Sequence, residues 1–156
     1  MSLTQYVIEQ RFDVPPARLY AAFTDPALLR RWIWGRDAPG VEVEIDPRVN
    51  GTITVSMPMK GEDGEVTTRV AMRGIYLELA PGARVVHTVH WDASVGYNAP
   101  GMSPLDEVLA ITIRPDDDGA HLTYTHLGIP DDGMSAKEHE RSVRVTLRDL
   151  AQILVD

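Results

Sequence analysis

The C-terminal stretch, residues 135–155, constrains the fold more than any other part of the chain. Ser135 and, three residues later, Glu138 match a capping box, in which both side chains satisfy free backbone N–H groups at a helix start. No Gly or Pro interrupts the residues after this pair. Apolar residues recur there at helical spacing: Val143, Leu147, Leu150, Ala151 and Leu154. The sequence therefore predicts a long helix with one side buried against another element.

Most of the preceding chain predicts strands. Residues 4–14 form a first strand that Pro15-Pro16 ends, and two short helices come next, the second starting at Asp25-Pro26. Alternating apolar and polar residues from Val41 onward predict about six consecutive antiparallel strands, with Asn50-Gly51 as a hairpin signal. Gly74 predicts a bulge or bend and leaves the inward face of its strand open. The expected fold is α+β, with the long helix on the hollow face of the sheet.

Length and composition narrow the function. A chain of 156 residues favours one domain spanning 1–156. A net charge of −8 argues against nucleic-acid binding, and the lack of cysteine excludes disulfides and cysteine-ligated zinc. Residues 1–10 do not resemble a signal peptide, and no apolar run is long enough to span a bilayer, so we expect a cytoplasmic protein. No phosphate-binding loop or dinucleotide fingerprint is present, so we expect no cofactor.

The phase of the strands and of the long helix directs a set of side chains into the space between them, and the two tryptophans at the end of the second short helix need cover there as well. Most are apolar or aromatic, the methionines add adaptable surface and the histidines add polar anchors, and ordinary core packing is the alternative for each. We expect these residues to bind a small hydrophobic molecule: Trp32, Trp34, Met57, Met59, Met72, His87, Val89, Trp91, Leu109, Tyr124, His126, His139, Val143 and Leu147.

Three inward polar residues, His87, Glu107 and His126, are candidates for catalysis. A histidine–carboxylate pair can act as general acid and base when it lies within hydrogen-bond reach of a substrate. A histidine in a strand is more often a hydrogen-bonded wall residue. The spacings lack the usual zinc patterns, so we predict no metal site. By phase, His90 and His121 fall on the outer surface.

Several motifs along nearly the whole chain resemble those of AHSA-type proteins, homologues of the activator of the heat-shock-protein ATPase within the START-like superfamily. They are Val14–Tyr20, Phe23–Trp32, Asp46-Pro47 with Asn50-Gly51, Asp63-Gly64, Glu78–Pro81 and Leu122–His126. The resemblance implies a helix-grip fold: a curved antiparallel sheet of about seven strands around the C-terminal helix, with two short helices after the first strand. Relatives commonly enclose an apolar cavity that binds lipids, hormones or polyketides, and a few catalyse cyclisation there.

The resemblance favours binding of a hydrophobic or aromatic small molecule without a reaction. A cyclase- or hydratase-like enzyme and a co-chaperone or protein-interaction module stay open, as does a homodimer. Ser142-Val143 stands where the family often has Gly-Trp, a change expected to reshape the cavity. No segment resembles the chaperone-binding region of the eukaryotic activator, so a chaperone partner is not expected.

Overall fold

The computed structural model describes residues 2–60, 63–93 and 106–156, and within them shows a seven-stranded antiparallel sheet with helices on its hollow side. The strand order is β1-β7-β6-β5-β4-β3-β2, so β1 returns to pair with β7 across the longest sequence separation in the sheet. The elements are β1 (Leu3–Phe12), α1 (Pro16–Thr24), α2 (Pro26–Leu29), β2 (Glu42–Ile45), β3 (Thr52–Lys60), β4 (Val66–Ala80), β5 (Arg84–Ala93), β6 (Glu107–Asp116), β7 (Gly119–Pro130) and α3 (Ser135–Val155).

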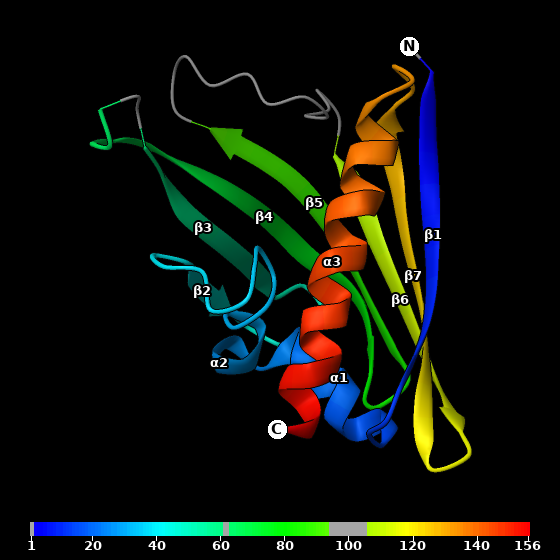
Figure 1. Cartoon of the computed structure of the whole chain (residues 1–156). Coiled ribbons are helices and arrows are strands. Elements are labelled where there is room, and N and C mark those ends of the chain that lie inside the picture. The colour runs from blue at the N-terminus through cyan, green and yellow to red at the C-terminus, as the bar shows by residue number, and fades with distance from the viewer. Residues whose placement is uncertain (1, 61–62, 94–105) are drawn as a thin grey trace.

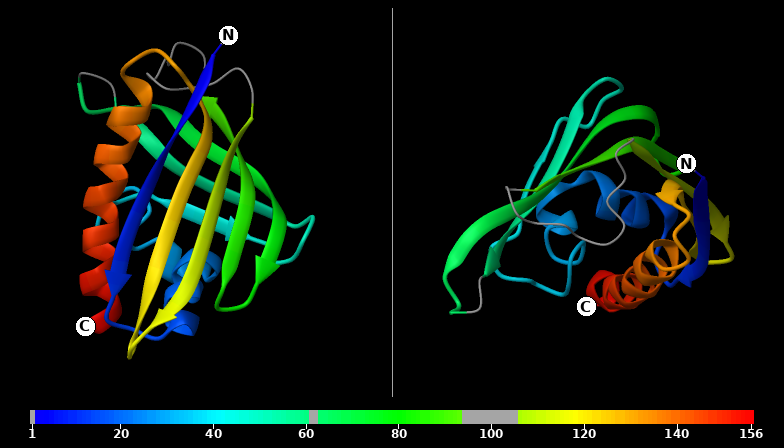
Figure 2. Two further views of the ribbon diagram at one scale, coloured as in Figure 1. Left: turned by 90° about the vertical axis from the view of Figure 1, so that its right-hand side faces the viewer. Right: turned by 90° about the horizontal axis from the view of Figure 1, so that it is seen from above.

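The sheet curves around its helices (Figures 1 and 2). Helix α3 runs along β1 and β7, while α1 and α2 close the end of the molecule where the chain terminates. Seen from above, β3 and β4 bend away from α3. This confirms the predicted α+β arrangement of a curved sheet around a C-terminal helix. Within the described ranges, no helix combines the length and the apolar character that crossing a membrane requires.

The inward face of β4, which alternation leaves ambiguous, carries Met72 and Tyr76. Both side chains are buried, whereas Ile75 and Leu77 on the other face are exposed. Gly74 lies on the inward face, and a Cβ there would sit 2.0 Å from the backbone oxygen of Thr88, so only glycine permits the strands to approach this closely. The register shift lies between Tyr76 and Glu78, slightly beyond the glycine.

The start of α3 differs from the predicted capping box. Ser135 is the first helical residue, so it cannot act as the cap, and its buried hydroxyl donates to the carboxylate of Asp132. The same carboxylate accepts the backbone N–H groups of Met134 at 2.9 Å and of Ser135 at 2.7 Å. Asp132, rather than the pair Ser135 and Glu138, therefore satisfies free N–H groups at this helix start.

Strand β7 is longer than the sequence indicates. Gly128 is predicted to begin the connection to the helix, but it adopts a left-handed conformation with φ of 82° inside the strand. The pairing with β1 shifts register between Thr4 and Gln5, opposite this glycine. Gly128 thus forms a bulge, and β7 continues to Pro130.

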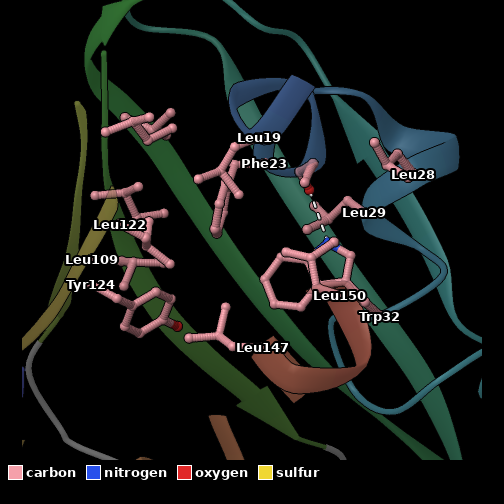
Figure 3. Close-up of a cluster of buried hydrophobic side chains, with 14 of the residues drawn as sticks. Leu19, Phe23, Leu28, Leu29, Trp32, Leu109, Leu122, Tyr124, Leu147 and Leu150 are labelled. Carbon is pink, nitrogen blue, oxygen red and sulfur yellow. Dashed lines mark hydrogen bonds between the residues drawn. The ribbon is translucent and has the colours of Figure 1, made fainter. Parts of the chain in front are cut away.

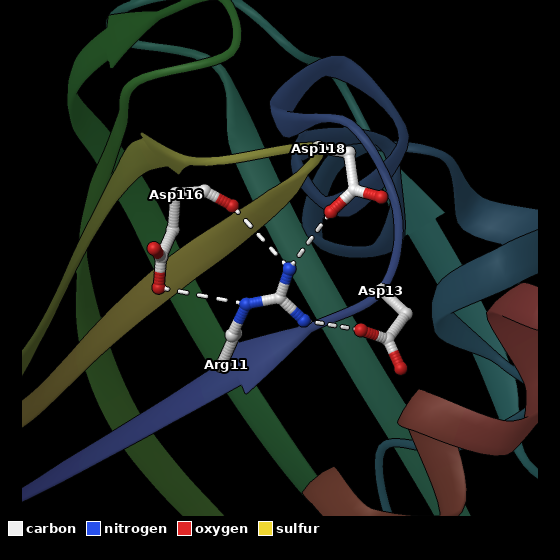
Figure 4. A network of polar contacts seen from close by, with 4 residues as sticks. All are labelled: Arg11, Asp13, Asp116 and Asp118. Carbon is white, nitrogen blue, oxygen red and sulfur yellow. Dashed lines mark hydrogen bonds and ion pairs between the residues drawn. The ribbon is translucent and has the colours of Figure 1, made fainter.

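Arg11 ties the end of β1 to the acidic turn between β6 and β7 (Figure 4). Its guanidinium donates to the carboxylates of Asp13 and Asp118, the latter at 3.1 Å, and lies 3.6 Å from a carboxylate oxygen of Asp116. These groups are partly or fully exposed, so each pair contributes little alone. Together they hold the β6–β7 turn against the first strand.

The hydrophobic core joins the helices to the sheet (Figure 3). Leu147 and Leu150 of α3 are fully buried, as is Leu19 of α1. Trp32, just after α2, is 1 % exposed, and its indole N–H donates to the backbone oxygen of Ala22 at 3.0 Å. That hydrogen bond fixes the two short helices to each other, which packing alone must otherwise hold.

We expect Leu150→Ala to lower the free energy of unfolding by about 2–5 kcal/mol, because it leaves a cavity between α3 and the sheet. Val145→Ala on the same helix removes a side chain that is 51 % exposed and should change the free energy by less than about 0.5 kcal/mol. Urea denaturation measures both. If both variants lowered the free energy of unfolding equally, the Leu150 side of α3 would not be the side that packs against the sheet.

Asp132→Ala should lower the melting temperature by about 2–4 °C at neutral pH. Hydrogen bonds from Ser135 and Met134 lower the pKa of Asp132 to about 2, so its stabilising contribution is complete above the pKa of the unfolded chain and is lost as the pH falls toward 2. The melting curves of variant and wild type should therefore converge on acidification. Asp131→Ala serves as the neighbouring control. If Asp132→Ala still had a lower melting temperature than the wild type at pH 2, the stabilising role assigned to the Asp132 carboxylate would be contradicted.

Candidate functional site

A cavity of about 340 Å³ lies between α3, the concave face of the sheet and the segment after α2. The inward-facing residues that line it come from strands β1 and β3–β7 and from all three helical regions. Among the residues predicted from the sequence, it is lined by Trp32, Trp34, Met72, His87, Val89, Trp91, Leu109, Tyr124, His126, His139 and Val143.

Three residues of the predicted set lie outside the lining. Met57 and Met59 share the inward face of β3 but lie farther along it, beyond Val55 and toward the turn that leads to β4. Leu147 is fully buried in the contact between helix and sheet, and its backbone oxygen accepts the side-chain amide of Gln10 at 3.1 Å. Alternation identifies the face of a strand but not how far the cavity extends along it.

Sequence reasoning missed seven lining residues. Tyr6 alternates in phase with the buried Ile8, and Ile53 with the buried Val55, so the phase of these strands could have found both. The places of the others depend on how the short helices and α3 are oriented in the fold. The seven are Tyr6, Phe23, Leu29, Ile33, Ile53, Ser142 and Thr146.

Aromatic rings form one wall of the cavity. The indoles of Trp34 and Trp91 stack with 6.3 Å between centroids and 22° between planes. The Trp91 ring also lies 6.0 Å from the imidazole of His139 on α3. Trp32 is held edge-on against Phe23 at 5.2 Å. This wall presents broad, rigid apolar surfaces to whatever enters.

A chain of hydrogen bonds forms the polar part of the wall. The imidazole of His126 contacts the hydroxyl of Tyr6 through Nδ1 at 3.1 Å and Oε1 of Glu107 through Nε2 at 2.6 Å. The indole N–H of Trp91 donates to the same Oε1 at 3.3 Å. Because a carboxylate accepts, Nε2 carries the hydrogen, and Nδ1 accepts the hydroxyl of Tyr6.

Glu107 is fully buried and does not itself line the cavity. Its second oxygen, Oε2, has no hydrogen-bond partner among the residues that the structure describes. The carboxyl group therefore acts on the cavity through His126, whose ring it orients. Of the three candidates for catalysis, Glu107 and His126 are in contact, whereas His87 is held by a different partner.

His87 is buried, and its Nδ1–H donates to the backbone oxygen of Thr88 at 2.8 Å. Burial lowers the pKa of His87 to about 4, although the hydrogen bond to Thr88 acts in the opposite direction. The ring is therefore neutral at pH 7. Burial also raises the pKa of Tyr6 and of Tyr124, so both phenols keep their protons.

The remaining polar predictions concern metal binding and the outer surface. In the described ranges, no three His, Asp or Glu side chains gather in a way that could hold a metal ion. His90 is exposed and lies 2.9 Å from Asp106, and His121 is partly exposed and lies 3.2 Å from Glu9. Both histidines are on the outer side, as their phase predicts.

Comparison with known proteins identifies the family. A protein-family model described as "Activator of Hsp90 ATPase homolog 1-like protein" matches residues 13–155. The chain belongs to this family. No curated protein matches the chain. The START-like resemblance drawn from the sequence motifs is therefore confirmed, and it extends over nearly the whole chain.

Several solved structures share the fold. Protein CV1439 from Chromobacterium violaceum is 29 % identical, with a TM-score of 0.74 and 96 % of each chain covered. The Mll3558 protein from Rhizobium loti is 26 % identical, with a TM-score of 0.75, covering 97 % of this chain and 96 % of that one. The AHSA1 protein from Silicibacter pomeroyi, at 24 % identity and a TM-score of 0.67, covers 97 % and 98 % and supports the fold alone.

The buried contact between Glu107 and His126 predicts a specific stability effect in this AHSA1-like chain. Glu107→Ala leaves the N–H groups of His126 and Trp91 without an acceptor and should cost about 2–5 kcal/mol. Glu107→Gln keeps an oxygen in place and should cost less than about half of that. Urea denaturation compares the two variants, and equal costs would refute the acceptor role of Oε1.

Proposed function

We propose that this AHSA1-like protein binds a hydrophobic or aromatic small molecule in the cavity between α3 and the sheet. The observation that carries the proposal is the cavity itself, about 340 Å³ of space that no described side chain fills. Small-molecule sites are typically concave and mostly apolar, with a few polar groups that fix orientation. The lining has this character, because aromatic and aliphatic side chains predominate and Tyr6, Tyr124 and the histidines supply the polar groups.

Binding is favoured over catalysis by the state of the histidines. Both ring nitrogens of His126 are engaged, one with Tyr6 and one with Glu107. His87 is a weak base, because burial lowers its pKa to about 4. A general base near neutral pH needs a pKa close to the working pH and a free nitrogen facing the substrate. The polar groups are therefore better suited to orient a ligand than to exchange protons with it.

A role as a protein-interaction module predicts an interior packed solid with side chains. The space between the indole of Trp34, the ring of Tyr124 and the side chain of Val143 argues against that role. The fold alone does not decide the matter, since one fold supports many functions. The apolar character of the cavity favours the small molecule.

Titration with flat aromatic compounds, sterols and long-chain alcohols should change the intrinsic tryptophan fluorescence of the protein. The stacked indoles of Trp34 and Trp91 line the cavity, so a bound ligand alters their surroundings. No response across the whole panel would contradict the proposed function.

A matched pair of variants locates the binding event. Val143→Phe adds volume inside the cavity and should weaken binding at least about tenfold, because the added ring occupies ligand space. Val145→Phe adds the same volume on the exposed face of α3 and should leave the affinity unchanged. Phenylalanine does not disturb the tryptophan signal. Equal affinities for both variants would place the binding site elsewhere.

A further inference from the structure

The charge of the cavity wall narrows the class of ligand. Among the described residues that line the cavity, none is lysine or arginine. The segment 94–105, which the structure does not describe, contains neither residue in its sequence. An anionic headgroup entering this space would therefore lose its hydration without meeting a permanent cation.

The histidine side chains of the cavity wall do not supply a positive charge in place of lysine or arginine. His87 is neutral above about pH 4 because of its burial. The ring of His126 is bound to the carboxyl group of Glu107, so the pair carries a net positive charge only if both groups are protonated. A buried carboxyl directly behind the imidazole opposes a second negative group in the cavity.

The cations nearest to this wall belong to a neighbouring surface hollow and not to the lining of the cavity. Lys137, Arg141 and Arg144 of α3 line that hollow together with Tyr6, and the two arginines are paired with Glu138 and Glu140 respectively. Burial, the neighbouring Tyr124 and the negative charges of Glu107 and Glu140 all raise the pKa of Tyr6, so its phenol stays uncharged in the wall. The net charge of −8 adds a weak repulsion of anions at longer range.

We propose that the cavity selects molecules without a formal negative charge, such as phenols, alcohols, ketones and amides, over carboxylates and phosphates of the same shape. This inference rests on the proposed function and names its ligand class. The phenols and imidazoles of the wall donate and accept hydrogen bonds, which suits a single uncharged oxygen or nitrogen on an apolar body. Burial of an unpaired carboxylate in such a site is strongly unfavourable.

Isothermal titration calorimetry with three naphthalenes of matched shape tests the selection. At about pH 8, where a histidine of ordinary pKa is neutral, 2-naphthol and 2-naphthamide are uncharged and 2-naphthoate is an anion. We expect both neutral compounds to bind and 2-naphthoate to bind about 10- to 100-fold more weakly. Equal affinities for all three would leave binding in the cavity intact and overturn the charge selection alone. Failure of all three, together with a silent fluorescence panel, would overturn the proposed function as well.

A positive charge placed at the edge of the cavity provides a second test of the charge selection. Ser142 lies on the exposed side of the lining, where a longer side chain can be accommodated on α3. Ser142→Lys supplies the missing cation and should narrow the difference between 2-naphthol and 2-naphthoate by about tenfold. Ser142→Gln has a similar length without charge and measures the steric effect alone. A difference that stayed the same in Ser142→Lys would contradict the proposal.

Discussion

The packing of α3 against one half of the sheet determines the rest of this structure. Helix α3 contacts β1 and β7, its Leu147 and Leu150 are fully buried, and Gln10 of β1 donates its side-chain amide to the backbone oxygen of Leu147. The sheet bends, so the strands farther from this contact curve away from the helix (Figure 2). The space that separates them is the cavity. An interior closed by one helix and one bent sheet is well packed along their contact and open beyond it.

The polar chain in the wall depends on the same arrangement. Tyr6 of β1 reaches His126 only because β1 returns to pair with β7, and these two residues are direct partners in that pairing. Glu107 completes the chain from β6. Burying a carboxyl group is costly unless donors surround it, and the N–H groups of His126 and Trp91 supply them. The pairing of the first and last strands therefore gives the cavity its polar anchors.

The sequence predicts the elements of this fold and most of the cavity wall, because period-two alternation and helical spacing indicate directly which face is buried. It predicts the bounds of α3 but not the side chain that accepts its free N–H groups, which is Asp132 and not the predicted pair Ser135 and Glu138. It places Met57 in the cavity because alternation contains no information on where a bent strand passes beyond the cavity. The sequence alone does not predict the contact between Tyr6 and His126, because that contact depends on pairing between distant strands.

The backbone and the lining side chains contribute differently to the cavity. Curvature, the anchored helix and the short helices fix a space of a given shape, and these features result from backbone pairing and core leucines. The chemistry of the space depends on the few side chains that face it. Here those side chains are mostly aromatic and aliphatic, with imidazoles and phenols that have a carboxyl group behind them, and neither lysine nor arginine is among the described ones. The chemistry of the cavity is therefore determined less by the fold than by the side chains that line it.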